Sequence, residues 1–198
     1  LVFLGERMKA KVLMTAAAFA AVGGMVSAQD WGGGYVGLSA NSGDGSLDLL
    51  GSPFAYKIDG GTELGIYAGY NHVLASNLVV GGELSYSSAE GSSMPITPWG
   101  YDGMLQVRAR VGYAMDNIMP YIALGMAKTD LNLAGVIVTD ESGITFAVGL
   151  DYMMNDKMSL RFEYNEARFN SVGEPTIFPP DVADLKIKTL TIGAAFHF

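Results

Sequence analysis

Residues 107–115 read VRARVGYAM, and this stretch decides the fold class of the chain. Apolar residues occupy every second position, and two arginines, Arg108 and Arg110, stand between them. Strict alternation of this kind places one set of side chains on each face of a β-strand. One face of this strand is therefore apolar, and the other carries fixed positive charge.

The same two-residue period recurs along most of the chain. Five further segments alternate as clearly as the quoted one or nearly so, and two weaker segments complete a set of eight. The expected strands cover approximately residues 33–40, 63–71, 78–87, 104–114, 121–128, 144–152, 159–165 and 189–198. Most are close to the ~9–11 residues that a tilted strand needs to cross a bilayer.

The connections between these strands alternate in length. Short connections are expected near residues 73–77, 115–118 and 155–157, and long ones near 41–62, 88–101, 129–142 and 170–185. Short turns at one end and long loops at the other are typical of outer-membrane barrels. The pattern predicts an all-β fold, an eight-stranded antiparallel up-and-down transmembrane β-barrel, formed as one domain by residues 29–198.

Residues 1–28 have the features of a secretory signal peptide. Arg7, Lys9 and Lys11 precede an apolar run over residues 12–22, and small residues end at Ala28. These features predict export with cleavage after Ala28. Residues 1–7 precede the first methionine and are interpreted as an upstream extension. The apolar run is shorter than the ~20 residues of a membrane-spanning helix.

The apolar faces of the strands could point outward to lipid or inward to a ligand. A soluble periplasmic, lipocalin-like carrier would turn them inward, and this remains the alternative fold. The lipid-facing arrangement is favoured because no charge interrupts the middle of any apolar face, and because the opposite faces consist mainly of small residues. Aromatic residues near the strand ends fit the two interfacial girdles of such barrels: Tyr70, Tyr86, Tyr113, Tyr152, Tyr164 and Phe198.

The arginines of the quoted stretch then face the lumen and need partners there, because an unpaired buried charge is costly. The inward faces supply three cations and three anions: Glu83, Arg108, Arg110, Asp151, Arg161 and Glu163. We expect these six residues to form an ion-pair network that closes the lumen. A narrow porin-like channel for small solutes, gated by the same network, is the alternative.

Three segments of the chain resemble a known family. VRARVGYAMDNIMPYIALGMA (107–127), ITFAVGLDYMMNDKMSLRFEYNEARF (144–169) and TIGAAFHF (191–198) are similar to the opacity-type and Omp25/Omp31-like surface antigens of Gram-negative bacteria, which belong to the porin family of small barrels. The resemblance implies an outer-membrane protein with a structural or surface-antigen role. It implies that Phe198 ends a signal read by the barrel-assembly machinery. Because loops on a rigid scaffold often carry recognition, we expect the long loops to bind host or environmental ligands.

Other functions find little support in the composition. The net charge of −8 argues against nucleic acid as a partner, and the chain has no Cys and only His72 and His197. Residues 32–37 fit G-x-G-x-x-G, but no strand precedes them and no helix follows, so we expect a flexible segment there. We expect no enzyme activity, no catalytic residue, no cofactor and no metal site.

Overall fold

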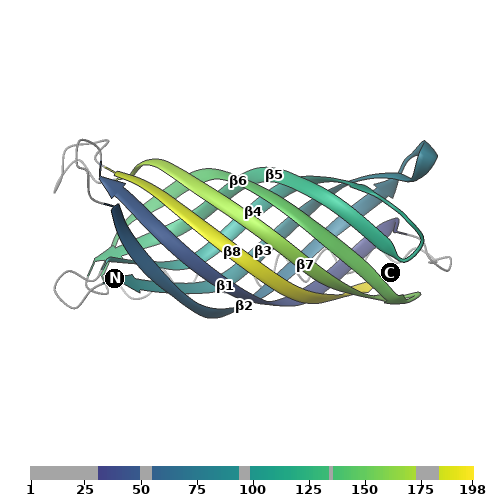
Figure 1. Cartoon of the computed structure of the whole chain (residues 1–198), viewed down its shortest axis with the longest axis horizontal. Helices are drawn as coiled ribbons and strands as arrows, with labels where there is room; N and C mark the ends of the chain where they lie inside the picture. The colour runs from purple at the N-terminus through teal and green to yellow at the C-terminus, as the bar shows by residue number, and fades with distance from the viewer. Residues whose placement is uncertain (1–30, 50–54, 94–98, 134–135, 173–182) are drawn as a thin grey trace.

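A computed structural model describes residues 31–49, 55–93, 99–133, 136–172 and 183–198. Within these residues, each strand pairs antiparallel with the next, and the first pairs with the last to close a barrel (Figure 1). This confirms the predicted all-β, eight-stranded antiparallel fold. Residues 1–28, the expected signal peptide, lie outside the described residues. The strands are β1 (Gly33–Leu49), β2 (Ala55–Val73), β3 (Leu78–Ser93), β4 (Trp99–Tyr113), β5 (Ile118–Leu133), β6 (Val136–Asn155), β7 (Met158–Val172) and β8 (Ala183–His197).

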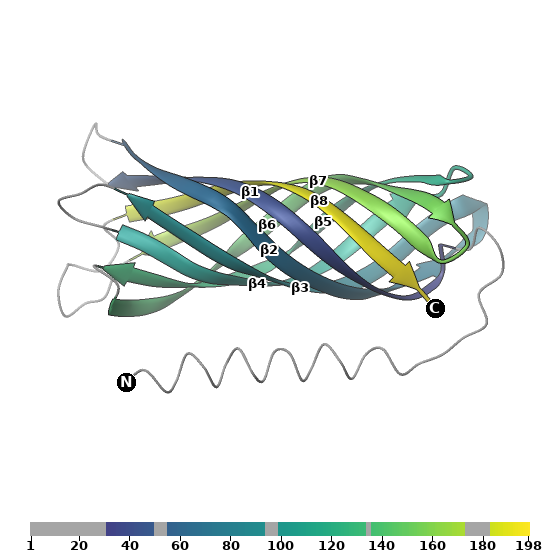
Figure 2. The same cartoon turned by 90° about the horizontal axis from the view of Figure 1, so that it is seen from below.

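Three tight turns join β2 to β3, β4 to β5 and β6 to β7, at the positions that the sequence predicts. The first contains the 3₁₀ turn Ala75–Asn77, and in the third the Asn155 side chain accepts hydrogen bonds from the backbone N–H groups of residues 157 and 158, both at 3.0 Å. The turns lie at the barrel end where β8 finishes (Figure 2). Among the described residues, no helix is long and apolar enough to span a membrane.

The strands are longer than the sequence predicts. They run for 15 to 20 residues, and β1 and β2 stay paired from Gly33–Asn71 to Asp48–Ala55. The predicted extents of the four long connections are therefore wrong. Beyond the lipid a strand needs no apolar face, so the alternation fades while backbone pairing continues. Residues 50–54, 94–98, 134–135 and 173–182 lie outside the described part.

The apolar face of each strand points outward. Val107 is 60% exposed on the barrel exterior, whereas its neighbour Arg108 is 4% exposed in the lumen. The outward residues of β5 and β8 repeat this arrangement, as Leu124 and Ile192 show with 61% and 60% exposure. A carrier of apolar ligands requires the opposite arrangement, so the lipocalin-like alternative is wrong.

The barrel closes where the two ends of the chain meet. Gly34 and Phe198 exchange backbone hydrogen bonds of 3.0 and 2.9 Å, and the Phe198 ring lies over Gly34, where a Cβ would overlap it. The glycine-rich segment 32–37 therefore enters β1, which starts at Gly33. The expectation that this segment is flexible was wrong, because glycine here makes room for a neighbouring ring.

Candidate functional site in the barrel lumen

Charged side chains from β3, β4, β6 and β7 meet inside the barrel and are all buried. Arg108 bridges Glu83 and Glu163, with 2.7 Å between its Nη1 and Glu163 Oε1. Arg110 contacts Asp151 Oδ2 at 2.6 Å. The group, which we call the lumen charge cluster, consists of the six residues selected from the sequence: Glu83, Arg108, Arg110, Asp151, Arg161 and Glu163.

Glu83 is the centre of the cluster. Its Oε2 lies 2.6 Å from Arg161 Nη1 and 3.2 Å from Arg110 Nη1, and its Oε1 is bound by Arg108. The Glu83–Arg108 contact joins direct strand partners, as the sequence suggests. The contact with Arg161 crosses the lumen from β3 to β7, and neighbouring strands alone could not have indicated it.

Two lumen tyrosines complete the polar network. The Tyr35 hydroxyl donates to Glu83 Oε2 at 2.7 Å and accepts from Arg110 Nη1 at 2.9 Å. The Tyr121 hydroxyl donates to Glu163 Oε2 at 2.6 Å. The Tyr121 hydroxyl satisfies a buried carboxylate oxygen that Arg108 does not contact, and leaving such an oxygen unpaired is costly. The Tyr35 hydroxyl adds a further partner to Glu83 Oε2. Sequence reasoning did not include either tyrosine in the site.

Aromatic rings also cover the guanidinium groups. The centre of the Arg110 guanidinium lies 4.0 Å from the Tyr121 ring centroid, and that of Arg161 lies 4.2 Å from the Tyr67 ring centroid. Cation–π contacts at this distance are favourable, more so when desolvated. Together, the charge cluster and its three tyrosines join β1 through β7 across the lumen.

Each of these tyrosines faces a glycine on the adjacent strand. A Cβ on any of the three glycines would overlap the facing ring or its hydroxyl. The high glycine content of the lumen face therefore has a steric reason: it makes room for aromatic side chains in a narrow barrel. The facing pairs are Tyr35 with Gly69, Tyr67 with Gly37, and Tyr121 with Gly149.

A second layer lies between the charge cluster and the tight turns. Trp31 inserts into this end of the barrel and packs with Val79, Met119 and Met153. Its indole N–H donates to the backbone oxygen of Asp116 at 3.1 Å. We call these four packed residues the apolar floor. Sequence reasoning missed it because Trp31 precedes the first strand and shows no alternation.

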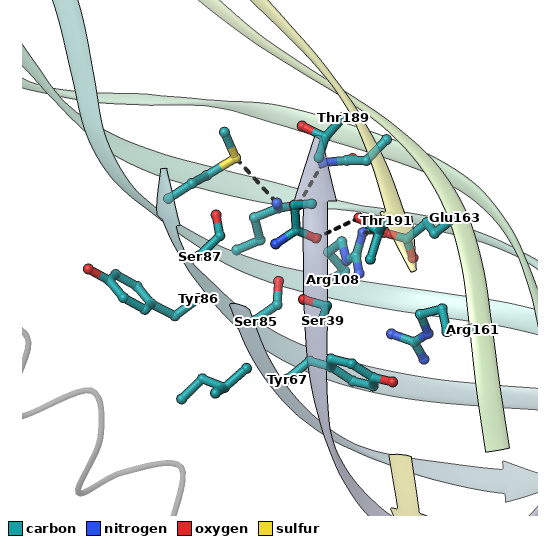
Figure 3. A pocket seen from close by; sticks show the side chains of 15 residues that line it. Ser39, Tyr67, Ser85, Tyr86, Ser87, Arg108, Arg161, Glu163, Thr189 and Thr191 are labelled. Atoms are coloured by element: carbon teal, nitrogen blue, oxygen red, sulfur yellow. Dashed lines mark hydrogen bonds and ion pairs between the residues drawn. The ribbon is translucent and has the colours of Figure 1, made fainter. Parts of the chain in front are cut away.

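On the opposite side of the charge cluster the lumen contains a polar cavity. Arg108, Arg161 and Glu163 form part of its lining, and serine, threonine and amide side chains form most of the rest (Figure 3). Its volume is about 430 Å³, counted with the solvent space into which it opens. Within the described residues, no group of three or more acidic or histidine side chains is placed to hold a metal ion.

Of the six residues expected to form aromatic girdles, four lie at the tight-turn end, whereas Tyr86 and Tyr164 lie near the middle of the long strands β3 and β7, toward the outer limit of the apolar face. Tyr70, Tyr113 and Tyr152 are exposed at the tight-turn end, where Phe198 ends the chain. Tyr164 is exposed and Tyr86 half-buried nearer the other end. Their role at the membrane interface stays a prediction.

The sequence profile of the family described as "Outer membrane protein beta-barrel domain" matches residues 13–198. The chain belongs to this outer-membrane barrel family. This barrel is 28% identical to the 31 kDa outer-membrane immunogenic protein of Brucella melitensis, over 85% of the chain and 84% of the relative. It is 32% identical to the 25 kDa outer-membrane immunogenic protein of Brucella abortus, over 71% of the chain and 67% of the relative.

Solved structures show the same fold. Neisserial surface protein A superposes with a TM-score of 0.56 at 16% identity, covering 83% of this barrel and 97% of that protein. Ail of Yersinia pestis, solved with the heparin analogue sucrose octasulfate, gives 0.53 at 15% identity, covering 84% and 99%. The protein is therefore an outer-membrane β-barrel, and its curated relatives are immunogenic outer-membrane proteins.

Proposed function

We propose that this protein is a closed barrel that supports the outer membrane and presents its long connections at the cell surface. The observation that carries the proposal is the lumen charge cluster, which joins strands across the barrel rather than lining a pore. In this arrangement residues 29–198 are the mature barrel, both termini are periplasmic, and Phe198 ends the strand offered to the assembly machinery.

Closure of the lumen is supported by two successive layers. The charge cluster fills the cross-section with contacts of 2.6–3.2 Å between its ions. The apolar floor then covers the tight-turn end, where Trp31 and Met119 are almost completely buried. A solute would have to separate buried ion pairs, and breaking one such pair costs about 3–5 kcal/mol, before it reached an apolar layer.

Surface presentation is supported by the length of the strands. They continue past the apolar belt and would hold the long connections away from the membrane. Rigid scaffolds commonly present loops for recognition, and the relatives are immunogenic proteins by name. Ail was solved with a heparin analogue, so a host or environmental ligand at the long connections is part of this proposal.

Conductance in planar lipid bilayers tests the closed state. We expect wild-type protein to show no discrete channel steps. Replacing two cations and two anions together, in Glu83→Ala/Arg110→Ala/Asp151→Ala/Arg161→Ala, removes most of the charge cluster and leaves the neutral Arg108–Glu163 pair. We expect this variant to stay closed because the apolar floor remains, and to conduct only when Trp31→Ala is added.

Folding of each variant is checked by heat-modifiable migration on a denaturing gel. The matched control is Trp31→Ala alone, which keeps the charge cluster and should stay closed. Channel steps from folded wild-type protein would refute the closed barrel and favour the porin-like alternative.

A further inference from the structure

The polar cavity in the lumen lies on the side of the charge cluster away from the tight turns, and charged side chains form its inner end. Arg108, Arg161 and Glu163 are part of the lining (Figure 3), and they carry two positive charges and one negative charge. The other three members of the cluster are not part of the lining. The inner end of the cavity therefore has an excess of one positive charge.

Two buried polar groups of the lining residues have no hydrogen-bond partner in the part of the chain that the structure describes. They are the Nε–H group of Arg108 and the hydroxyl group of Tyr67, and both residues are only 4% exposed. Leaving a buried polar group unsatisfied is costly, and such a group commonly marks the place of a water or an ion. Both groups can donate, so a ligand with hydrogen-bond acceptors would satisfy them.

The other charged groups of the lining are already engaged. Glu163 Oε1 accepts from Arg108 Nη1 at 2.7 Å, and its Oε2 accepts from the Tyr121 hydroxyl at 2.6 Å. Arg161 donates from Nε and Nη2 to the two carboxylate oxygens of Asp151, at 2.9 and 3.2 Å. The cavity therefore offers a ligand donors and positive charge, which favour an anion over a cation.

Size limits the ligand. Most of the cavity volume of about 430 Å³ is open to solvent, and its enclosed part holds about two or three water-sized groups. Serine, threonine and amide side chains form most of the surrounding wall, so a ligand meets polar groups on several sides. A molecule of two or three carbons suits this space, whereas a sugar ring is too large for the enclosed part.

We propose that the cavity binds a small hydroxycarboxylate of two or three carbons, such as glycolate, from outside the cell. The carboxylate accepts a charge-assisted hydrogen bond from Arg108 Nε, and the hydroxyl group of the ligand binds the Tyr67 hydroxyl, so both unsatisfied groups gain a partner. The ligand reaches the cavity from the barrel end opposite the tight turns and does not pass the charge cluster. The site is therefore independent of whether the lumen conducts.

The test is an NMR titration of the refolded full-length protein in detergent micelles, with the ¹⁵N resonance of Arg108 Nε as the reporter. Three small probes separate the two contacts: glycolate offers both groups, acetate lacks the hydroxyl group, and ethylene glycol lacks the charge. We expect glycolate to shift the resonance and to bind about fivefold more tightly than acetate, since one hydrogen bond contributes about that factor. Ethylene glycol should leave the resonance unchanged.

Tyr67→Phe tests the second contact, because it removes only the hydroxyl group and keeps an aromatic ring over Arg161. We expect this variant to bind glycolate as weakly as acetate, with its affinity for acetate unchanged. The matched control is Tyr70→Phe, which removes a hydroxyl group from the exposed exterior of the barrel and should keep the preference for glycolate. Gel migration confirms that each variant is folded.

Four results would overturn the proposal. These are an unchanged Arg108 resonance with glycolate, equal affinity of the wild-type protein for glycolate and acetate, a preference for glycolate that persists in Tyr67→Phe, and an equal shift with ethylene glycol. Three of them come from wild-type protein alone and decide the matter even where a substitution prevents folding. Channel steps in planar bilayers would refute the closed barrel without affecting these titrations, so the two proposals fail separately.

Discussion

Side chains in the lumen fit together by size as well as by charge. Tyr121 places its hydroxyl on Glu163 and its ring beneath Arg110 because Gly149, opposite it, has no side chain. The polar network in this narrow barrel therefore depends on glycines, which contribute no side-chain hydrogen bond but leave room for the tyrosine rings. The outward-facing Gly82 has no such role, since the space around it is open.

Gly149→Ala should destabilise the protein. The added Cβ would overlap the Tyr121 ring, and overpacking of this kind costs about 1–3 kcal/mol. The free energy of unfolding, from denaturant titration in lipid vesicles, measures the effect. Gly82→Ala is the control, because a Cβ there meets nothing within 4 Å. Equal stability of the two variants would show that the Tyr–Gly pairing is unimportant.

The sequence identified the charged part of the site but not its aromatic part. Alternation placed Glu83 and Arg108 on inward faces of neighbouring strands, and opposite charges made their pairing a reasonable prediction. Alternation also placed Tyr67 on an inward face. It does not show how far each strand is shifted along the barrel axis relative to the others, which determines the side chains that meet across the lumen. The contact of Tyr67 with Arg161, and the insertion of Trp31, depend on that stagger.

At the scale of single elements, β8 and β1 have a special position because their pairing closes the barrel. Phe198 contributes backbone hydrogen bonds to Gly34 and covers it with its ring. The two strands of this seam are the first and the last of the barrel, so their pairing joins segments that are far apart in the chain. In the proposed function, Phe198 at this seam belongs to the strand offered to the assembly machinery.

Phe198→Ala should reduce the yield of folded protein in the outer membrane several-fold, because the assembly machinery would recognise the last strand poorly. Spontaneous refolding into detergent should stay near the wild-type level. Phe196→Ala is the control, since Phe196 points outward from the same strand and is 46% exposed. Similar losses in cells for both variants would argue against a specific signal at the last residue.

Strand length was the main element-level feature that the sequence did not predict. Within the membrane each strand must present an apolar face to lipid, and this requirement produces a visible period. Beyond the membrane both faces meet water, and segments such as 42–46, SGDGS, have the composition of a loop. They nevertheless continue β1, since β2 and β8 supply hydrogen-bond partners on both sides.

For the whole molecule, the apolar belt determines how deeply the barrel sits in the membrane. Along β5 the belt runs from Ile118 to Met126, which places the outward-facing Ile122 at its middle. On β2, Thr62 lies beyond the belt, at the level where charged residues are tolerated. The exterior therefore consists of a central zone that excludes charge and a border that accepts it.

Ile122→Arg should destabilise the inserted barrel by about 2–4 kcal/mol, and Thr62→Arg by about 0–1 kcal/mol, because the cost of arginine on the lipid face depends on depth. Equilibrium unfolding in phospholipid vesicles measures both. The same two variants compared in short-chain detergent serve as a control, since a micelle imposes a weaker depth requirement. Equal costs in vesicles would place the belt at a different height.

Continuation of paired strands past the lipid has a consequence for antibodies. Near the outer edge of the barrel, Asp44 of β1 lies directly beside Lys188 of β8, although the two residues are far apart in the chain. An epitope on this edge therefore combines distant segments and exists only while the sheet is intact. Sera raised against the folded barrel should lose much of their recognition after boiling, and short synthetic peptides should be poor vaccine antigens for this region.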